Sequence, residues 1–275
     1  MPRLPFIKKH LSEIHPAIYD FRIKQKRIFR NASDVLRKVK FANKKSADEL
    51  AFCVKKHQSL LRRKLGTSDP QLQTNKVQNL QLAAPLVDEL LIRPGETFSF
   101  WNSVGETTVA RGYLEGMQLS KGLVVCGIGG GLCQLANLLY WMALHTQLTV
   151  SERHHHSFDP FPDENRTLPF GSGASVFFNY VDLRFFNNTK STYQLRVWVS
   201  ENHLCGKILV DREPVESFHI IEKKHRFLTK GQQNFRENEI WRRKVDKRTG
   251  NTLGEEMLIK NFAEVKYKLE DTETT

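Results

Sequence analysis

The chain has 275 residues, a hydrophobic fraction of 40% and a formal net charge of +12. This composition supports a packed core, in one large domain with appendages or in two small domains. No run of about 18 apolar residues occurs, so a membrane-spanning helix is not expected. The basic charge favours an anionic partner, such as nucleic acid, a membrane surface or a wall polymer, and a solvated basic surface is the alternative.

The four cysteines show no C-x-x-C redox pair, and their separations of 73, 7 and 72 residues do not resemble a disulfide framework. The chain therefore reads as reduced, and Cys133 is the one thiol in a chemically suggestive sequence.

Residues 1–33 form a basic N-terminal arm. The arm lacks the uninterrupted apolar run of a secretory signal, which predicts a cytoplasmic or membrane-peripheral location. Action on the wall would then require an export route that the sequence does not reveal. Apolar residues interleaved with Lys and Arg could contact an anionic membrane or wall polymer, and an ordinary cationic helical arm is the other interpretation.

Residues 34–70 read as a helical segment. Ser46 and Glu49 have the spacing of a capping box, and the residues from Gly66 to Pro70 are typical of a helix end. A second helix is predicted over residues 75–91, with a break or kink at Pro85.

The remaining elements are mostly strands around one helix. Pro94-Gly95 predicts a turn before a short strand that holds Phe98 and Phe100 on one face. We further expect a strand at 123–125, a helix over 132–145, strands within 147–158 and 174–186, an antiparallel hairpin over 192–211 and a strand–turn–strand over 239–261.

The fold class is therefore α+β: N-terminal helices are followed by a mostly antiparallel sheet packed on a helix that begins at a glycine-rich turn. Four regions are expected, namely the arm at 1–33, the helical segment at 34–70, a central domain at 71–214 and a charged strand–turn–strand extension at 215–275.

Cys133 follows the glycine-rich run from Gly127 to Gly131, with Leu132 between them, and is expected near the start of the central helix. Glycines permit positive φ and leave space near a thiol. A helix N-terminus favours a thiolate and would lower the cysteine pKa. Backbone N–H groups at Gly130, Gly131 and Gln134 could hold an oxyanion. The alternative is a small buried residue at a tight helix entry.

The segment that returns after this helix supplies candidate bases. In a strand, Glu152, His154 and His156 share one face, while Arg153 and His155 share the other. About seven strand residues span the length of a 13-residue helix, so His154 or His156 could reach Cys133. The histidines could instead bind a metal together with a cysteine, or form an exposed polar strand end.

Asp182 lies in an otherwise apolar, aromatic segment, and a buried acid requires a partner. It could orient a histidine as the third member of a Cys–His–acid set, or pair with Arg184 or Arg153; we slightly favour an ion pair. No nucleic-acid-binding motif accompanies the basic residues, and no nucleic-acid partner is expected.

These segments resemble the VanW family. The resemblance covers about residues 71–200 and rests on "NKVQNLQLAAPLV", "IRPGETFSFWNSVG", "GYLEGMQLSKG", "GIGGGLCQLANLLYWMALH", "TVSERHHHSF" and "SGASVFFNYVDLRFFNNT". It implies a cell-wall context and an association with glycopeptide resistance. Related domains have been linked to L,D-transpeptidase chemistry with a cysteine nucleophile, which would be Cys133 here.

Three hypotheses follow. The preferred one is cysteine-dependent acyl transfer on a peptidoglycan stem peptide, in which His156 or His154 moves the proton and Arg153 binds a carboxylate. The second is a non-catalytic accessory that binds a wall precursor or a resistance enzyme. The third is a metal-dependent hydrolase. The preferred hypothesis requires no cofactor or metal.

Overall fold

The computed structural model describes residues 16–62, 69–120, 123–155, 158–159, 167–178 and 181–268. The chain divides into two compact units, residues 1–39 and 40–275. The first unit contains helix α1 (Pro16–Leu36), which confirms a helix in the basic arm. Among the described residues, no helix combines the length and apolar character needed to cross a bilayer.

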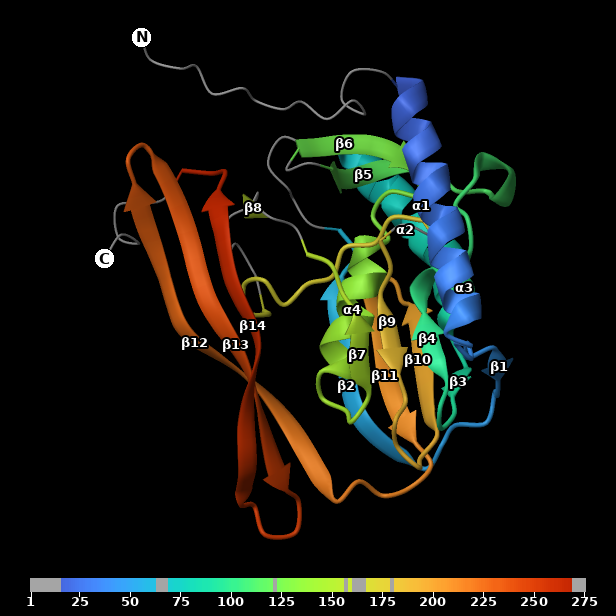
Figure 1. The fold of residues 1–275 in the computed structure, drawn as a ribbon, viewed down its shortest axis with the longest axis vertical. Coiled ribbons are helices and arrows are strands. Elements are labelled where there is room, and N and C mark those ends of the chain that lie inside the picture. The colour runs from blue at the N-terminus through green and yellow to red at the C-terminus, as the bar shows by residue number, and fades with distance from the viewer. Residues whose placement is uncertain are drawn as a thin grey trace. The chain divides into compact units, whose positions relative to one another are not determined.

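The second unit is built on a five-stranded antiparallel sheet with the order β1-β3-β10-β11-β2 (Figure 1). Its central strands, β10 (Tyr193–Val199) and β11 (His203–Val210), form the predicted hairpin, in which Tyr193 pairs with Val210 and Val199 with Leu204. The other strands are β1 (Lys44–Lys45), β2 (Phe52–Leu60) and β3 (Leu90–Ile92).

Two helices pack on this sheet: α2 (Pro70–Val87) contacts β10, and α4 (Cys133–Ala143) contacts β11 and β2. The close approach of α4 depends on Gly206, where an added Cβ would lie 2.8 Å from the terminal methyl carbon of Met142. Leu138 and Met142 are fully buried against the sheet. Burial of the apolar face of α4 therefore fixes where its first residue, Cys133, lies.

The second unit also contains two smaller sheets. One has the order β4-β9-β7, with strands β4 (Thr97–Ser99), β9 (Arg184–Phe186) and β7 (Thr149–Glu152); the other pairs β5 (Glu115–Ser120) with β6 (Leu123–Ile128). The short helix α3 (Phe100–Val104) follows β4, and a single 3-10 turn, η2 (Val109–Arg111), precedes β5. The predicted short strands near residues 97–99 and 123–125 are thus confirmed, but Phe100, which was expected to share a strand face with Phe98, begins α3.

The C-terminal region is a sheet of three long strands, β12 (Glu216–Lys230), β13 (Gln233–Asp246) and β14 (Thr252–Val265), and the two-residue strand β8 (Phe158–Asp159), which runs parallel to β14 (Figure 1). The predicted strand–turn–strand is confirmed by β13 and β14. Strand β12 was not predicted, because its apolar residues are interspersed with charged ones.

The expected fold class is confirmed, because helices accompany sheets that are mostly antiparallel. The helical prediction for residues 34–70 is wrong beyond Leu36, since the segment enters the sheet as β1 and β2. Strand β2 pairs antiparallel with β11, which lies about 150 residues later in the chain. In β2 the half-buried Phe52 and Val54 lie on either side of the exposed Cys53, so burial alternates with the period of two that is typical of a strand. In a short apolar segment this spacing is easily mistaken for that of a helix.

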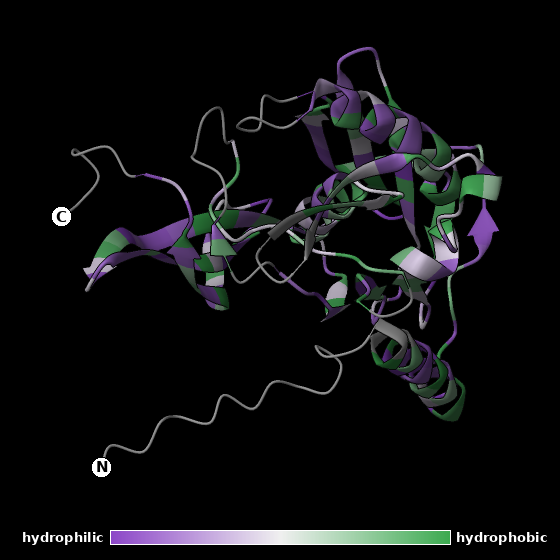
Figure 2. Cartoon of the chain, turned by 90° about the horizontal axis from the view of Figure 1, so that it is seen from above, coloured by the Kyte–Doolittle hydropathy of each residue, from purple (hydrophilic) through white to green (hydrophobic). Residues whose placement is uncertain are grey.

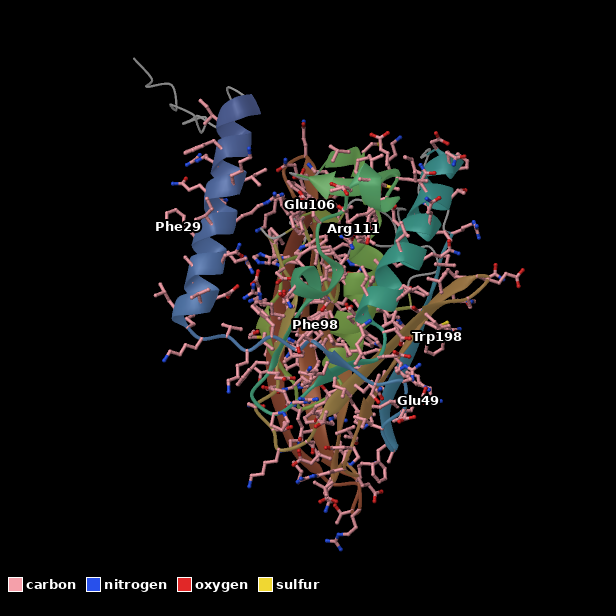
Figure 3. All side chains as sticks on the ribbon, turned by 90° about the vertical axis from the view of Figure 1, so that its right-hand side faces the viewer. Phe29, Glu49, Phe98, Glu106, Arg111 and Trp198 are labelled. Atoms are coloured by element: carbon pink, nitrogen blue, oxygen red, sulfur yellow. The ribbon has the colours of Figure 1, made fainter. Side chains whose placement is uncertain are left out.

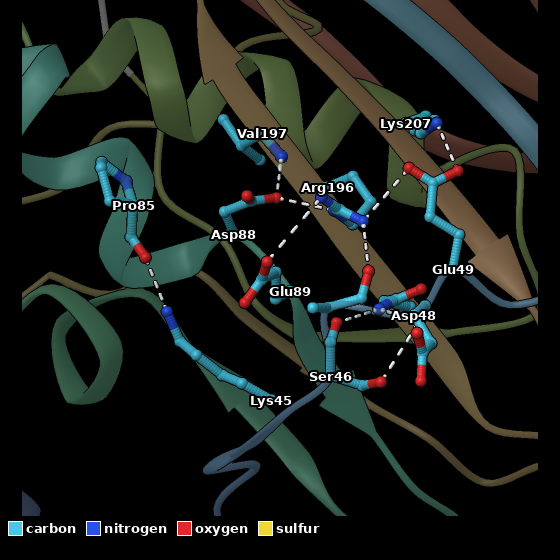
Figure 4. Close-up of polar contacts among 12 residues, drawn as sticks. Lys45, Ser46, Asp48, Glu49, Pro85, Asp88, Glu89, Arg196, Val197 and Lys207 are labelled. Carbon is cyan, nitrogen blue, oxygen red and sulfur yellow. Dashed lines mark hydrogen bonds and ion pairs between the residues drawn. The ribbon is translucent and has the colours of Figure 1, made fainter.

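The predicted capping box is also wrong, because Ser46 and Glu49 belong to a polar cluster around Arg196 (Figure 4). Arg196 donates to Glu49 (3.1 Å) and to Asp88 (3.0 Å), and Lys207 donates to the other Glu49 oxygen (2.7 Å). These bonds hold residues 46–49 against β10 and β11, and the Lys207 bond, the largest influence, lowers the pKa of Glu49.

Helix α2 begins five residues earlier than predicted, at Pro70, where the Asp69 carboxylate accepts from the N–H of Gln71. It ends at Val87 and runs through Pro85, so the expected break is absent. Pro85 lies in the last turn, where the helix has few further hydrogen bonds to lose.

Two predicted strands are shorter than expected. The strand within 147–158 ends at Glu152, and the one within 174–186 is confined to residues 184–186, preceded by isolated bridges at Ser175 and Phe177. The domain boundaries expected near residues 33, 70 and 214 stay predictions.

Candidate functional site

The glycine turn before Cys133 is a tightly packed corner. Gly129 and Gly131 adopt φ values of +77° and +93°, which confirms the expected need for glycine. A Cβ on Gly130 would lie 2.0 Å from the carbonyl carbon of Gly116 in β5. A Cβ on Gly131 would lie 2.2 Å from Cγ of Lys76 in α2. The glycines therefore let α2, β5 and the turn approach one another, rather than leaving open space.

A buried asparagine on α2 fixes this turn. The side-chain amide of Asn79 donates to the carbonyls of Gly130 (2.9 Å) and Leu114 (3.0 Å), and its oxygen accepts from the N–H of Leu114 (2.8 Å). Asn79 is fully buried. Asn79 was not predicted as a site residue. Its position directly before the apolar Leu80 in the helix was the available signal, because a buried polar side chain needs hydrogen-bond partners.

Two of the three predicted oxyanion donors are used inside the protein. The N–H of Gly130 donates to Gly127 (3.0 Å), and the N–H of Gln134 donates to Gly131 (3.0 Å). Both N–H groups therefore have partners within the turn, and their role as oxyanion donors stays a prediction. The Gln134 side chain instead joins α4 to the end of β2, through Ser59 Oγ (2.9 Å) and the Leu60 carbonyl (2.8 Å).

Cys133 begins α4 as predicted, but the expected acidic thiol is wrong. The residue as a whole is partly exposed, whereas its thiol is buried. This burial raises the pKa of Cys133, and hydrogen bonds with the backbone of Val176 and of Cys133 itself oppose the rise. Loss of hydration of the thiolate outweighs the helix N-terminus here, so the resting side chain is a neutral thiol.

The segment at residues 174–176 connects α4 to the histidine region. The Asn137 side chain, one turn after Cys133, accepts from the N–H of Ala174 (2.6 Å). Val176 bonds the cysteine sulfur through its backbone, and Ser175 donates its N–H to the carbonyl of His154 (2.9 Å). Cys133 and His154 therefore contact adjacent residues of one segment.

His154 and Glu152 form a histidine–acid pair. His154 Nε2 lies 2.9 Å from Glu152 Oε1. Because a carboxylate only accepts, Nε2 donates to Glu152, and Nδ1 is the ring nitrogen that this bond leaves unused. The same Glu152 oxygen accepts from the N–H of Asp182 (3.1 Å), and Arg184 lies 3.5 Å from the other oxygen. Glu152 is thus held in place by Arg184 in β9 and by Asp182, two residues before that strand.

Of the two histidines that follow His154, the structure describes His155 only. Burial and the nearby Arg153 and His154 lower the pKa of His155. His156, the other candidate base, lies outside the described residues.

Asp182 has a structural role among the described residues, and its alternative role of orienting a histidine stays a prediction. Its carboxylate is buried and accepts from Arg184 (2.8 Å), from the Ser99 hydroxyl (2.6 Å) and from the N–H of Trp101 (3.1 Å). The favoured ion pair with Arg184 is confirmed. Among the described histidines, His154 is bonded to Glu152.

Arg153 points to the opposite side from His154, as alternation predicts. Its guanidinium donates to the carbonyls of Gly171 and Gly173, and it lies 5.1 Å from the ring centroid of Tyr140. Burial lowers the pKa of Arg153 from its ordinary value. The side chain therefore holds the loop that leads to Val176, and its carboxylate-binding role stays a prediction.

The C-terminal sheet holds the same loop from another side. Asn238 and Asn261, both buried, donate to the carbonyl of Phe170 at 2.9 Å and 3.2 Å. A Cβ on Gly171 would lie 2.2 Å from the Asn261 side chain. The buried ion pair between Arg236 and Asp159 (3.1 Å) anchors β8 to β13 beside them. None of these contacts is visible in the local sequence.

The metal alternative gains no support within the part of the chain that the structure describes. There, no group of three or more His, Cys, Asp or Glu side chains is arranged to hold a metal ion.

Comparison of the sequence with known proteins identifies a family. The family model described as "VanW like protein" matches residues 75–209. The chain is 32% identical over 200 residues to the vancomycin B-type resistance protein VanW of Enterococcus faecalis (strain ATCC 700802 / V583), and the match covers 73% of each protein. It is 30% identical over 125 residues to the uncharacterized protein YoaR of Bacillus subtilis (strain 168), covering 44% of this chain and 39% of YoaR. No solved structure matches the chain.

Proposed function

Because the chain belongs to the VanW family, we propose that it serves glycopeptide resistance by cysteine-dependent acyl transfer on the stem peptide of a peptidoglycan precursor. The resistance context comes from the name of the enterococcal relative. The peptide substrate and the chemistry are our proposal, supported by the residues around Cys133.

One observation carries the proposal: the thiol of Cys133 and the backbone of His154 bond adjacent residues, Val176 and Ser175, while Glu152 holds the His154 ring. A cysteine nucleophile needs a base, and the base needs an orienting group. The shared segment, residues 175–176, is the link between α4 and the residues after β7 that supports this assignment.

In the proposed reaction, Cys133 Sγ attacks a peptide carbonyl carbon and its proton passes to His154 Nδ1. The tetrahedral intermediate then collapses: the carbon–nitrogen bond breaks, the leaving amine takes the proton from His154, and a thioester remains on Cys133. An acceptor amine or water attacks the thioester, and the thiol regains a proton as it leaves. Glu152 keeps the His154 ring oriented and stabilises its cationic form.

The raised pKa of Cys133 determines which version of this chemistry is possible. A preformed thiolate–imidazolium pair requires an acidic thiol, whereas the buried thiol here is neutral. His154 must then act as a general base during the attack. Alkylation of Cys133 by iodoacetamide should accordingly accelerate only above the ordinary cysteine pKa of about 8.5.

The decisive test is mass spectrometry of the full chain after incubation with a synthetic stem tetrapeptide. We expect a peptide adduct on Cys133 that Cys133→Ala abolishes and that hydroxylamine removes. Cys126→Ala, which removes an exposed thiol, is the matched control and should retain the adduct. An adduct that survives in Cys133→Ala would contradict the proposal.

Non-catalytic binding of a wall precursor or a resistance enzyme is the second candidate, and the buried, neutral thiol and the closed glycine turn favour it. In that case Cys133→Ala would bind the stem peptide with unchanged affinity, and no adduct would form in any variant. Metal-dependent hydrolysis, the third hypothesis, would require stoichiometric metal in the purified chain.

A further inference from the structure

Helix α1 displays large apolar side chains on its surface. Phe21, Ile28, Phe29, Val35 and Leu36 are each between 65% and 82% exposed. Figure 3 shows the Phe29 side chain projecting away from the helix axis. Soluble surfaces tolerate single exposed apolar residues, but an exposed cluster on one helix indicates an interaction surface.

These residues share one side of the helix. With 3.6 residues per turn, the five side chains and the less exposed Ile18 (39%) fall within an arc of about 120°. Gln25 is the polar residue inside that arc. Figure 2 shows the alternation of apolar green and polar purple bands along α1 that this arrangement produces. The arc repeats over five turns, so it is long enough to lie against an extended surface.

Cationic residues border the apolar arc. Lys24 lies next to one margin, and Arg22 and Lys26 lie beyond the other; all three are exposed. The helix contains five Lys or Arg and two Asp. An exposed apolar strip between cationic margins matches an anionic lipid surface, where the apolar side chains enter the acyl boundary and the cations meet phosphate groups.

We propose that α1 binds the surface of an anionic lipid bilayer, lying parallel to it with the apolar arc inserted. A pair of α1 helices from two copies could also cover the arc, but the like-charged margins would then repel each other. This inference does not depend on acyl transfer by Cys133, and its test uses no enzymatic readout.

The test is co-sedimentation of the full chain with vesicles of phosphatidylcholine alone or with phosphatidylglycerol added to about one third. We expect binding to the anionic vesicles only, weakened by added salt. Phe21→Ala/Ile28→Ala/Phe29→Ala should lower the partition coefficient by about tenfold or more, because each buried aromatic or aliphatic side chain contributes strongly. Alanine also keeps the helix intact, since it has the highest helix propensity.

The matched control is Val109→Ala/Val215→Ala, which removes two apolar side chains of the second unit, 69% and 73% exposed, and should bind like the parent chain. Lys24→Glu/Lys26→Glu leaves the apolar arc intact and should also abolish anionic binding. Equal binding to neutral vesicles, or unchanged binding of both α1 variants, would overturn the proposal. So would a dimer in light scattering that the triple variant dissociates while vesicle binding persists.

Discussion

The two ends of α4 each hold a buried titratable side chain, and they respond alike. Cys133 opens the helix, and His145 lies just after its last residue, Ala143. A helix dipole would lower the pKa of a thiol at the N-terminus and raise that of an imidazole at the C-terminus. In both places burial has the opposite effect and prevails: the pKa of Cys133 is raised, and that of His145 is lowered to about 4.

The comparison teaches that desolvation, not helix polarity, sets the charge states along α4. At the C-terminal end the Trp141 carbonyl accepts from His145 Nδ1 (2.9 Å), which favours the charged ring, yet burial outweighs this bond. Nearby Lys55, His57 and His219 lower the pKa further. Both groups are therefore neutral in the folded protein near pH 7.

The largest predicted effect concerns stability in acid, at the C-terminal end. The folded-state pKa of His145 is about 4, below its ordinary value of 6.5, so the unfolded chain binds the proton more readily. The neutral ring contributes stability that is complete above pH 6.5 and is lost as the pH falls toward 4. We expect this residue to account for a loss of about 3 kcal/mol in unfolding free energy between pH 7.5 and pH 4.

His145→Asn is the control, because its amide can still donate to the Trp141 carbonyl and cannot be protonated. Urea unfolding across this pH range should show a flatter dependence for the variant than for the parent chain. Parallel curves would show that His145 is protonated as easily in the folded state as in the unfolded one.

The sequence predicted α4 and the turns near it better than it predicted which residues pack around this helix. The helix, the positive-φ glycines and the β10–β11 hairpin follow from local periodicity and turn residues, and all three are confirmed. The pairing of Glu152 with His154 follows from strand alternation, although the regular strand ends at Glu152.

The missed features depend on partners far away in the chain. Strand β2 is defined by β11, the glycine turn is closed by Asn79, and the loop that reaches the Cys133 sulfur is held by Asn238 and Asn261. The pKa direction of Cys133 was mispredicted for the same reason, because burial arises from all of these elements together. Local sequence indicates the direction in which a helix end shifts a pKa, but it does not indicate how far the side chain is removed from water.

At the N-terminal end, Gly130→Ala should destabilise the fold by about 2 kcal/mol, because the new Cβ would overlap the Gly116 backbone, which cannot move without separating β5 from the turn. Gly254→Ala is the matched control, since a Cβ there meets nothing within 4 Å. Urea unfolding should separate the two variants. Equal stability of both would mean that the turn is looser than its packing indicates and could open toward a ligand.

The smallest expected effect tests how α4 is joined to the sheet at the cysteine end. Gln134→Ala removes the two hydrogen bonds to Ser59 and Leu60 and should cost about 1 kcal/mol of unfolding free energy, because the groups concerned are partly exposed. Gln58→Ala, on the exposed side of the same strand, should cost less than about 0.5 kcal/mol. If the loosened N-terminus of α4 also admits water to the thiol, the pH at which Cys133 is alkylated should shift downward in Gln134→Ala alone. An unchanged alkylation profile would assign the burial of the thiol to the 174–176 segment rather than to the attachment of α4 to β2.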